Sequence, residues 1–263
     1  MKIIVCVKQV PATTEVETDP ETGTLKRQGL ASIINPFDLY AIEEAVRIKE
    51  KTGAEVTALS MGPPQSAHAL KDAIALGCDR AVLLSDRAFA GADTLATAYT
   101  LAKGINHVGG ADLVICGVKT VDGDTAQVGP MISEELEVPF IGNVRKLTLK
   151  GKSAVMESVT DDGFVTLSSK TPVVLTVVKE INTPRLPDLE SKLSSKKAEV
   201  KVFSSADIGA DPCMIGLSGS PTNVLKVFTP DKRVAGELVR ASPKEAAKAL
   251  FDRIQELKVV DDG

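Results

Sequence analysis

The chain contains 263 residues, with 31 Lys and Arg against 35 Asp and Glu, for a formal net charge of −4. This near balance argues against a nucleic-acid partner bound through bulk positive charge, and 43% hydrophobic residues argue against a disordered chain. Aromatic residues make up only 3%, so the core must be built from aliphatic residues, and few rings are available to stack on bases or sugars.

The first residues form an apolar run, residues 3–7, that ends at Lys8. The run is too short for a signal peptide or a membrane span, and no later stretch reaches the roughly 18 apolar residues that a spanning helix needs. We interpret it as a buried strand, and we expect a cytoplasmic protein without membrane insertion.

Residues 1–135 alternate between strand-like and helix-like patterns, which indicates βαβ units and a parallel sheet. The strand candidates are short and rich in Val and Ile, as strands buried on both faces are. They lie at residues 3–7, 56–60, 81–84 and 113–116. Amphipathic helices are predicted around residues 42–49, 67–76 and 94–106.

Residues 9–34 interrupt this alternation with a long polar segment, which contains the turn sequence Asp19-Pro20-Glu21-Thr22-Gly23. A structureless loop of this length is uncommon in a compact domain. The segment is therefore either functional or a β-hairpin.

After Pro139 the pattern changes to strands separated by short turns. The strand-like runs lie at residues 144–149, 153–159, 164–168 and 173–178. We predict antiparallel strands that decorate the domain, with the last run returning to the main sheet.

From residue 180 onward the core pattern is lost, and only residues 243–257 recover a helical period. A final helix preceded by about 60 loosely patterned residues has no obvious place in its own domain. Because apolar residues recur in this stretch, we expect residues 1–180 to form the α/β domain and residues 181–263 to form an extended arm and helix that pack on another chain. A disordered tail is the alternative.

The four cysteines, Cys6, Cys78, Cys116 and Cys213, show no C-x-x-C spacing, and neither histidine lies near one in sequence. The pattern argues against a zinc site or a redox dithiol. We interpret the cysteines as small buried hydrophobes in a reducing compartment, and we expect no metal.

Three segments at the carboxyl ends of predicted strands are candidates for ligand binding, because open α/β sheets bind ligands there. In residues 6–11, backbone amides could read a purine edge, although an ordinary strand exit is the alternative. Residues 35–38 begin a helix: Asn35 suits the N-cap, Pro36 the first helical position, and Asp38 can reach back to the cap amide. That pattern explains a helix start without any ligand.

The third segment, residues 117–130, combines glycine, hydroxyl and amide groups before a helix. Free amides at that helix start suit a phosphate or pyrophosphate, and an ordinary capped loop is the alternative. Asp122 and Asp124 would repel the anion, so we expect them to hold ribose hydroxyls or to cap the helix. Pro130 indicates that the helix starts late or is kinked.

No nucleophile elbow, Walker A, G-x-G-x-x-G or H-E-x-x-H motif is present, so we assign no catalytic residue.

Four motifs, VKQVP, NPFD, ALSMGPPQ and D-x-D-x-x-Q-x-G, together make the chain resemble electron-transfer flavoprotein beta subunits over nearly its whole length. The resemblance implies a doubly wound, mostly parallel sheet related to adenine-nucleotide alpha hydrolases. It also implies an obligate alpha-subunit partner that carries an FAD. The cofactor-binding positions that it implies are Cys6, Val7, Asn35, Pro36, Phe37, Asp38, Met61, Gly117, Val118, Lys119, Thr120, Val121, Asp122, Gly123, Asp124, Thr125, Ala126, Gln127 and Val128.

The same loop departs from the usual members of the family, which hold AMP and carry three acids, then Asn, then Gln-Thr-Gly. Gly123 and the pair Thr125-Ala126 resemble instead the electron-bifurcating branch, in which a second FAD replaces AMP. That branch implies NADH as electron donor, ferredoxin or flavodoxin as one acceptor, and an acyl-CoA dehydrogenase as the other through the alpha-subunit FAD. The alternatives are a non-bifurcating subunit with structural AMP and a non-redox adenine-nucleotide module.

Residues 182–187 resemble the loop with which the family docks on an acyl-CoA dehydrogenase through a leucine. Leu186 is the best match, and Leu189 is a second candidate because the spacing differs by one residue. Ordinary packing at a subunit interface is the alternative interpretation.

Overall fold

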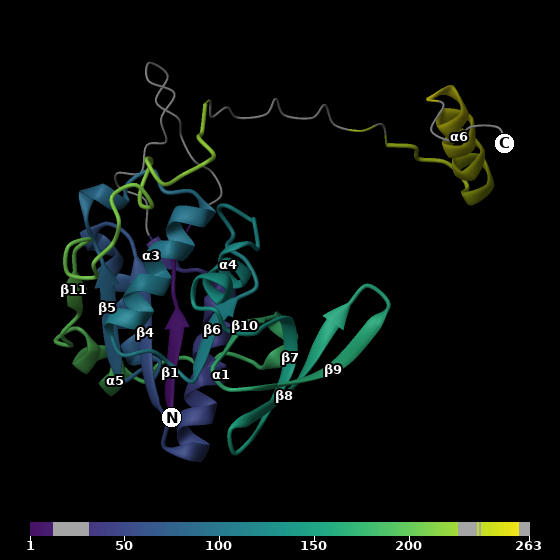
Figure 1. The fold of residues 1–263 in the computed structure, drawn as a ribbon. Coiled ribbons are helices and arrows are strands. Elements are labelled where there is room, and N and C mark those ends of the chain that lie inside the picture. The colour runs from purple at the N-terminus through teal and green to yellow at the C-terminus, as the bar shows by residue number, and fades with distance from the viewer. Residues whose placement is uncertain (13–31, 226–235, 237, 258–263) are drawn as a thin grey trace. The chain divides into compact units, whose positions relative to one another are not determined.

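A computed structural model describes residues 1–12, 32–225, 236 and 238–257 of the chain (Figure 1). The chain divides into two compact units, Met1–Val227 and Phe228–Gly263. Each unit is described by itself.

The described part of the larger unit is built on a sheet of nine strands in the order β11-β5-β4-β1-β6-β10-β7-β8-β9. Strands from β11 through β7 pair in parallel, and β7, β8 and β9 pair antiparallel. The bounds are Lys2–Cys6 (β1), Glu55–Met61 (β4), Arg80–Leu84 (β5), Leu113–Gly117 (β6), Phe140–Lys150 (β7), Ser153–Thr160 (β8), Gly163–Lys170 (β9), Val173–Val177 (β10) and Lys201–Phe203 (β11).

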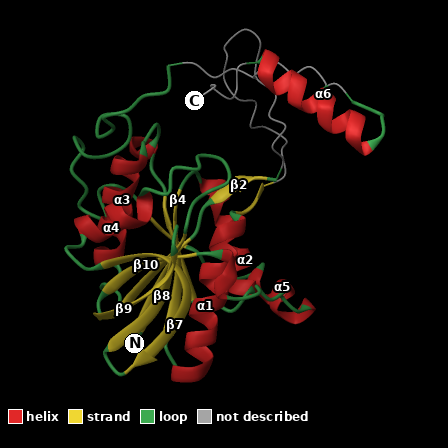
Figure 2. Ribbon diagram, turned by 90° about the vertical axis from the view of Figure 1, so that its right-hand side faces the viewer, coloured by secondary structure: helices red, strands yellow, loops and turns green. Residues whose placement is uncertain are grey.

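Helices cover both faces of this sheet, as Figure 2 shows. Helices α1 (Pro36–Thr52) and α2 (Ala67–Ala75) pack through one hydrophobic cluster, and α3 (Thr94–His107) and α4 (Val128–Glu135) pack through a second one on the opposite face. The doubly wound, mostly parallel α/β fold is confirmed. Short 3₁₀ turns lie at Pro64–Ser66 (η1), Arg87–Phe89 (η2) and Lys179–Ile181 (η3). In the described ranges, every helix is too short or too polar to cross a membrane.

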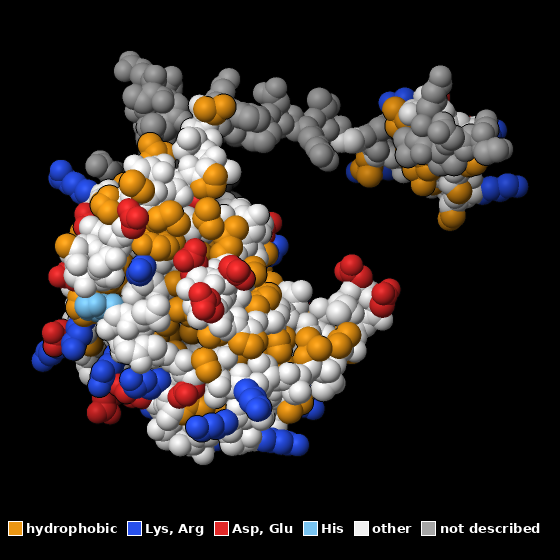
Figure 3. Space-filling view, in the orientation of Figure 1, with side chains coloured by type: hydrophobic (Ala, Val, Ile, Leu, Met, Phe, Trp, Pro, Cys, Tyr) orange, Lys and Arg blue, Asp and Glu red, His pale blue; other side chains and the backbone are white. Residues whose placement is uncertain are grey.

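The four predicted parallel strands are confirmed within two residues at each end. The change of pattern after Pro139 is also confirmed, because β7–β9 form an antiparallel extension and β10 returns to pair with β6. Figure 3 shows acidic side chains at the tip of the β8–β9 hairpin and apolar side chains along it. Arg145 lies over the ring of the exposed Phe164, 3.8 Å from its centroid.

The ends of the long polar segment pair with each other. β2 (Gln9–Pro11) and β3 (Ser32–Ile34) form a separate two-stranded antiparallel sheet, which supports the hairpin interpretation. The turn sequence at residues 19–23 lies outside the described residues.

The stretch after residue 180 contains elements that the sequence pattern did not predict. α5 (Leu189–Ser195) is followed by β11, which adds to the sheet edge beside β5. Farther along, the carboxylate of Asp86 accepts hydrogen bonds from the amide and hydroxyl of Ser205, and that of Asp93 accepts from Thr222 in the same way. The compact unit that contains these contacts extends to Val227. The division into an α/β domain of residues 1–180 and an arm of residues 181–263 stays a prediction. That residues 181–263 also pack on another chain stays a prediction.

The smaller unit contains the helix predicted at residues 243–257, which forms as α6 (Pro243–Glu256). Its first turn is closed by Glu245, whose carboxylate accepts hydrogen bonds from the amide and hydroxyl of Ser242. Leu250 and Phe251 are exposed on it.

Replacing Leu175 with Ala tests the core assignment, because Leu175 is fully buried on β10 between β6 and β7. We expect the free energy of unfolding to fall by about 2–5 kcal/mol, since the lost burial leaves a cavity. The matched control is Leu167→Ala on the edge strand β9, where the side chain is 40% exposed and the expected loss is below about 1 kcal/mol. Urea unfolding measures both, and equal losses would contradict the assignment.

Candidate functional site

The order of the strands places a ligand-binding crevice beside β1. The chain passes from β1 through α1 to β4 and β5 on one side, then returns through α3 to β6 on the other side. In open α/β sheets, ligands bind at the carboxyl ends of the strands where the order reverses. The segments that leave β1 and β6 at this edge are residues 7–12 and 118–127, which are two of the three predicted ligand segments.

Asn35 connects the start of α1 to the loop after β6. Its side chain is completely buried, and its amide nitrogen donates to the carbonyl of Lys119 at 2.9 Å. Its side-chain oxygen accepts from the backbone amide of Val121 at 3.2 Å. Asn35 holds the N-cap position as predicted, but its side chain makes no capping bond. It fixes the site loop instead.

Asp38 links the same region to the segment after β1. One carboxylate oxygen accepts from the backbone amide of Lys8 at 2.8 Å, and the other accepts from the side-chain amide of Asn35 at 2.8 Å. The prediction that the Asp38 carboxylate accepts from the backbone amide of the N-cap residue Asn35 is wrong. That amide donates to the carbonyl of Lys8, and Asp38 accepts from the backbone amide of Lys8 instead. Burial raises the pKa of Asp38 to about 7, against the opposing effect of these hydrogen bonds.

Gly117 lets β6 approach α1 closely enough for these contacts. A Cβ atom at this position would lie 2.5 Å from Oδ1 of Asp38 and 2.7 Å from the carbonyl carbon of Phe37. Only glycine fits here without moving the backbone of α1. The beginning of the site loop is therefore fixed by main-chain packing.

Two ion pairs hold the exposed part of the loop. Asp122 pairs with Lys8 at 2.7 Å, and Asp124 pairs with Lys119 at 2.7 Å. Burial raises the pKa of Asp122, but its contacts with Lys8 outweigh this and leave the pKa below the usual value. Neither acid caps α4, whose N-cap is Gln127, so that part of the prediction is wrong. Contact with ribose hydroxyls stays a prediction.

The loop ends in a set of open amides. Asp124 and Ala126 adopt left-handed backbone conformations, with φ of 50° and 53°. Within the described residues, no acceptor contacts the amides of residues 125–128. α4 begins at Val128, so Pro130 lies in the first turn, which confirms the late helix start. Amides free at a helix N-terminus suit an anion.

Two further predicted binding residues, Cys6 and Met61, lie on the α3 and α4 side of the sheet, whereas Val7 packs in the cluster of α1 and α2. Cys6 ends β1 and Met61 ends β4, and both contact the same hydrophobic cluster as Cys116. A hydrogen bond to Cys6, together with burial, raises the pKa of Cys116 above its usual value. Three cysteines are buried as interpreted, and Cys213 is exposed, which corrects that interpretation for this position.

Most of the predicted binding positions therefore gather at one edge of the sheet, and Leu186 and Leu189 lie apart from them on the segment after η3. Lys8 lies within the candidate segment 6–11, but its side chain was not predicted to take part in the site, where it pairs with Asp122. The sequence pattern also did not point to Thr94, whose hydroxyl donates to the side-chain oxygen of Gln127 at 3.0 Å. Within the described residues, no cluster of three or more His, Cys, Asp or Glu suits a metal.

The raised pKa of Asp38 predicts how stability depends on pH. The folded pKa of about 7 lies above the unfolded value of 3.8, so the folded protein binds the proton more tightly. Relative to Asp38→Asn, the stability of the wild-type protein should fall by about 3 kcal/mol between pH 5 and pH 8, with no further loss above that range. Urea unfolding of both proteins across this range measures the difference, and parallel pH profiles would contradict the raised pKa.

Comparison with known proteins agrees with the fold. A sequence model described as "Electron transfer flavoprotein domain" matches residues 22–208. The chain is 47% identical over 261 residues to an electron transfer flavoprotein subunit beta of Thermoanaerobacterium thermosaccharolyticum, covering 99% of this chain and 100% of the relative. It is 46% identical over 256 residues to the subunit beta of Clostridium acetobutylicum, covering 97% and 98%. It is 41% identical over 262 residues to the caffeyl-CoA reductase-Etf complex subunit CarD of Acetobacterium woodii, covering 99% and 100%. The chain therefore belongs to the electron transfer flavoprotein family, among its beta subunits.

Proposed function

We propose that this beta subunit binds FAD at the edge of the sheet between β1 and β6, and that it takes electrons from NADH within a heterodimer with an alpha subunit. In this proposal the electrons are divided between ferredoxin or flavodoxin and, through the FAD of the alpha subunit, an acyl-CoA dehydrogenase. The observation that carries the proposal is the loop at residues 118–127. Within the described residues it presents unbonded backbone amides at the start of α4, and the side chain of Asn35 holds it through hydrogen bonds to Lys119 and Val121.

The residues present fit the diphosphate and ribose of such a nucleotide. The open amides of residues 125–128 can donate to phosphate oxygens, and Lys8 and Lys119 supply positive charge beside them. The carboxylate of Asp122 can accept from ribose hydroxyls. The space beside Gly123 is open, since a Cβ there would meet only Thr120 Oγ1, at 3.5 Å, and without a side chain a ligand can approach the backbone through it.

The chain's own groups bind and orient the nucleotide and exclude water around it. With no Trp, 2 Tyr and 7 Phe in the sequence, few aromatic rings are available to enclose a flavin, and the site relies mainly on amides, small polar groups and aliphatic walls. Cys6 and Met61 can form such a wall for the adenine. A bound FAD would supply the hydride and single-electron chemistry, which the side chains do not provide.

The choice of FAD over AMP is supported by Gly123 and by the Thr125-Ala126 pair, which resemble the bifurcating branch. The CarD relative is named as a subunit of a caffeyl-CoA reductase-Etf complex. That name agrees with an acyl-CoA dehydrogenase-type partner for this chain.

Counting the cofactors tests this choice directly. The chain is co-expressed with its alpha subunit, the heterodimer is purified, and its nucleotides are released and separated by chromatography. We expect two FAD and no AMP per heterodimer. One FAD and one AMP would establish the non-bifurcating alternative, and a heterodimer without flavin after reconstitution with FAD would favour a non-redox nucleotide module.

Variants of the site loop test its assignment. Asp122→Ala removes the proposed ribose contact and the ion pair with Lys8, and Thr125→Ala removes a hydroxyl from the loop. We expect FAD at the beta site to be held about tenfold more weakly in Asp122→Ala, while the FAD of the alpha subunit stays bound.

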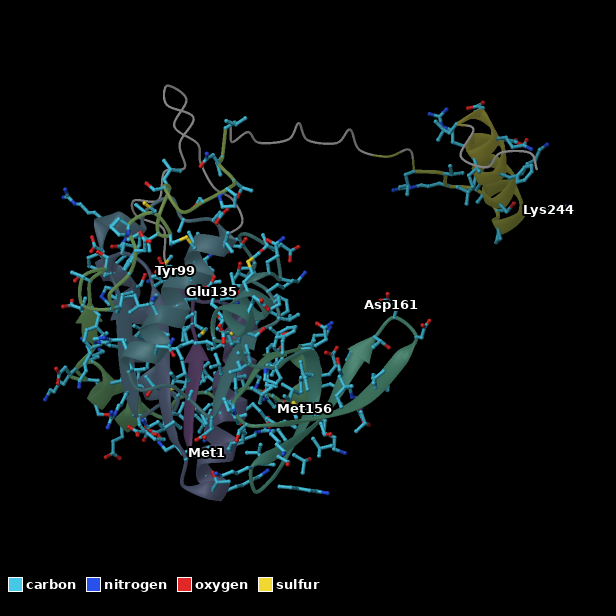
Figure 4. All side chains as sticks on the ribbon, viewed as in Figure 1. Met1, Tyr99, Glu135, Met156, Asp161 and Lys244 are labelled. Carbon is cyan, nitrogen blue, oxygen red and sulfur yellow. The ribbon has the colours of Figure 1, made fainter. Side chains whose placement is uncertain are left out.

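The matched control is Asp161→Ala, which removes an acid at the tip of the β8–β9 hairpin (Figure 4). Retained flavin is measured by absorbance after gel filtration and extraction. Full occupancy of the beta site in both loop variants would show that the nucleotide lies elsewhere.

A further inference from the structure

The segment that carries Leu186 is tied to α1 by side chains from both partners. Asn182 donates from its side-chain amide to the carbonyl of Tyr40 at 3.0 Å and to the carboxylate of Glu44 at 3.2 Å. Three residues later, the backbone amide of Arg185 donates to Glu43 at 3.1 Å. The chain therefore runs along α1 on its way from η3 to α5.

The guanidinium of Arg185 bridges two acids that lie two turns apart on α1. Its Nε and Nη2 atoms donate to Glu43 at 2.8 and 3.3 Å, and its Nη1 and Nη2 atoms donate to Glu50 at 2.5 and 3.1 Å. Such a planar double fork fixes the direction of the side chain as well as its distance.

Water cannot readily replace Arg185 as the partner of Glu43, because Glu43 is buried. Its side chain is 4% exposed, and it also accepts from Arg47 on the next turn of α1 at 2.6 Å. A buried carboxylate needs such partners. Burial raises the pKa of Glu43, but the hydrogen bonds from Arg185 and Arg47 outweigh this, so the pKa lies below its usual value.

Leu186, directly after this clamp, is 91% exposed. Pro184 and Pro187 restrict the backbone on both sides of it. Asp188 then begins α5, accepting from the amide of Ser191 at 2.7 Å. A large apolar side chain is thus held out from a backbone that is fixed at both ends.

We propose that Arg185 is a positioning residue that shapes residues 182–188 into a preformed docking loop by clamping them to Glu43 and Glu50. The inference rests on the proposed function, in which an acyl-CoA dehydrogenase accepts electrons, and on the expectation from the family resemblance that Leu186 contacts that dehydrogenase. A preformed loop lowers the entropy lost on docking, so its effect falls on affinity for the dehydrogenase and not on the electron transfer that follows.

The test uses the full heterodimer with its cofactors and the acyl-CoA dehydrogenase of the same organism as electron acceptor. Four variants are compared with the wild-type protein: Arg185→Ala, Arg185→Lys, Leu186→Ala and Arg47→Ala. Arg47→Ala is the matched control, because Arg47 also bonds Glu43 but belongs to α1 and does not carry the loop. The readouts are KM and kcat for the dehydrogenase, and hydrogen exchange at the amides of residues 185, 186 and 188.

We expect Arg185→Ala to raise the KM about tenfold at an unchanged kcat and to speed exchange at these amides. Arg185→Lys should recover part of the loss, because an ammonium holds one acid but not both. Arg47→Ala should leave the KM and the exchange unchanged. Flavin reduction by NADH should stay normal in Arg185→Ala. The melting temperature should fall in both Arg185→Ala and Arg47→Ala, because each leaves the buried Glu43 with one partner fewer. A cooperative melting transition above the assay temperature, together with a raised KM in Arg185→Ala alone, separates a docking defect from misfolding.

A KM that rises in Leu186→Ala but not in Arg185→Ala would overturn the positioning role of Arg185 and leave the proposed function intact. An unchanged KM in Leu186→Ala would remove the docking role of Leu186 and overturn this inference, while the proposed function, which the cofactor count tests separately, would stand. Unchanged hydrogen exchange in Arg185→Ala would overturn the clamp itself.

Discussion

The buried pair Asn35 and Asp38 is the contact on which the candidate site depends. These two side chains at the start of α1 bond to the backbone of Lys8 after β1 and to the backbone of Lys119 and Val121 after β6. Three segments that are distant in sequence therefore share one buried polar network. Because buried polar groups are expensive to leave unpaired, the network specifies one arrangement of the loops at this edge of the sheet.

In the exposed part of the loop, two acids and two lysines balance each other in charge. The acids of the loop face Lys8 and Lys119, and amides at the start of α4 stay free of intramolecular partners within the described residues. A loop with two acids can thus offer an anion site, because neighbouring lysines offset the repulsion. The scarcity of aromatic residues fits the same picture, since a site made of main-chain groups and lysines needs no rings.

The stretch after residue 180 adds the last strand, β11, to the edge of the sheet. β11 covers the edge beside β5, and Asp86 and Asp93 hold the following residues through Ser205 and Thr222. Each acid also bonds amides at the start of a helical turn next to it. The same carboxylates therefore cap local structure and fasten a distant segment, which explains why this loosely patterned stretch belongs to the larger unit up to Val227.

The sequence by itself determined the alternating βαβ order and the antiparallel extension after Pro139, because buried strands and amphipathic helices have characteristic periods in the local sequence. It also placed Asn35 at a helix start. The tertiary structure alone decided what Asn35 and Asp38 bind, that Lys8 faces Asp122, and that β11 joins the sheet. These contacts join residues that are about 30 to more than 100 positions apart, and no local pattern records such a partner. A three-residue strand such as β11 is likewise too short to show a period, so only the exposed edge of β5 defines it.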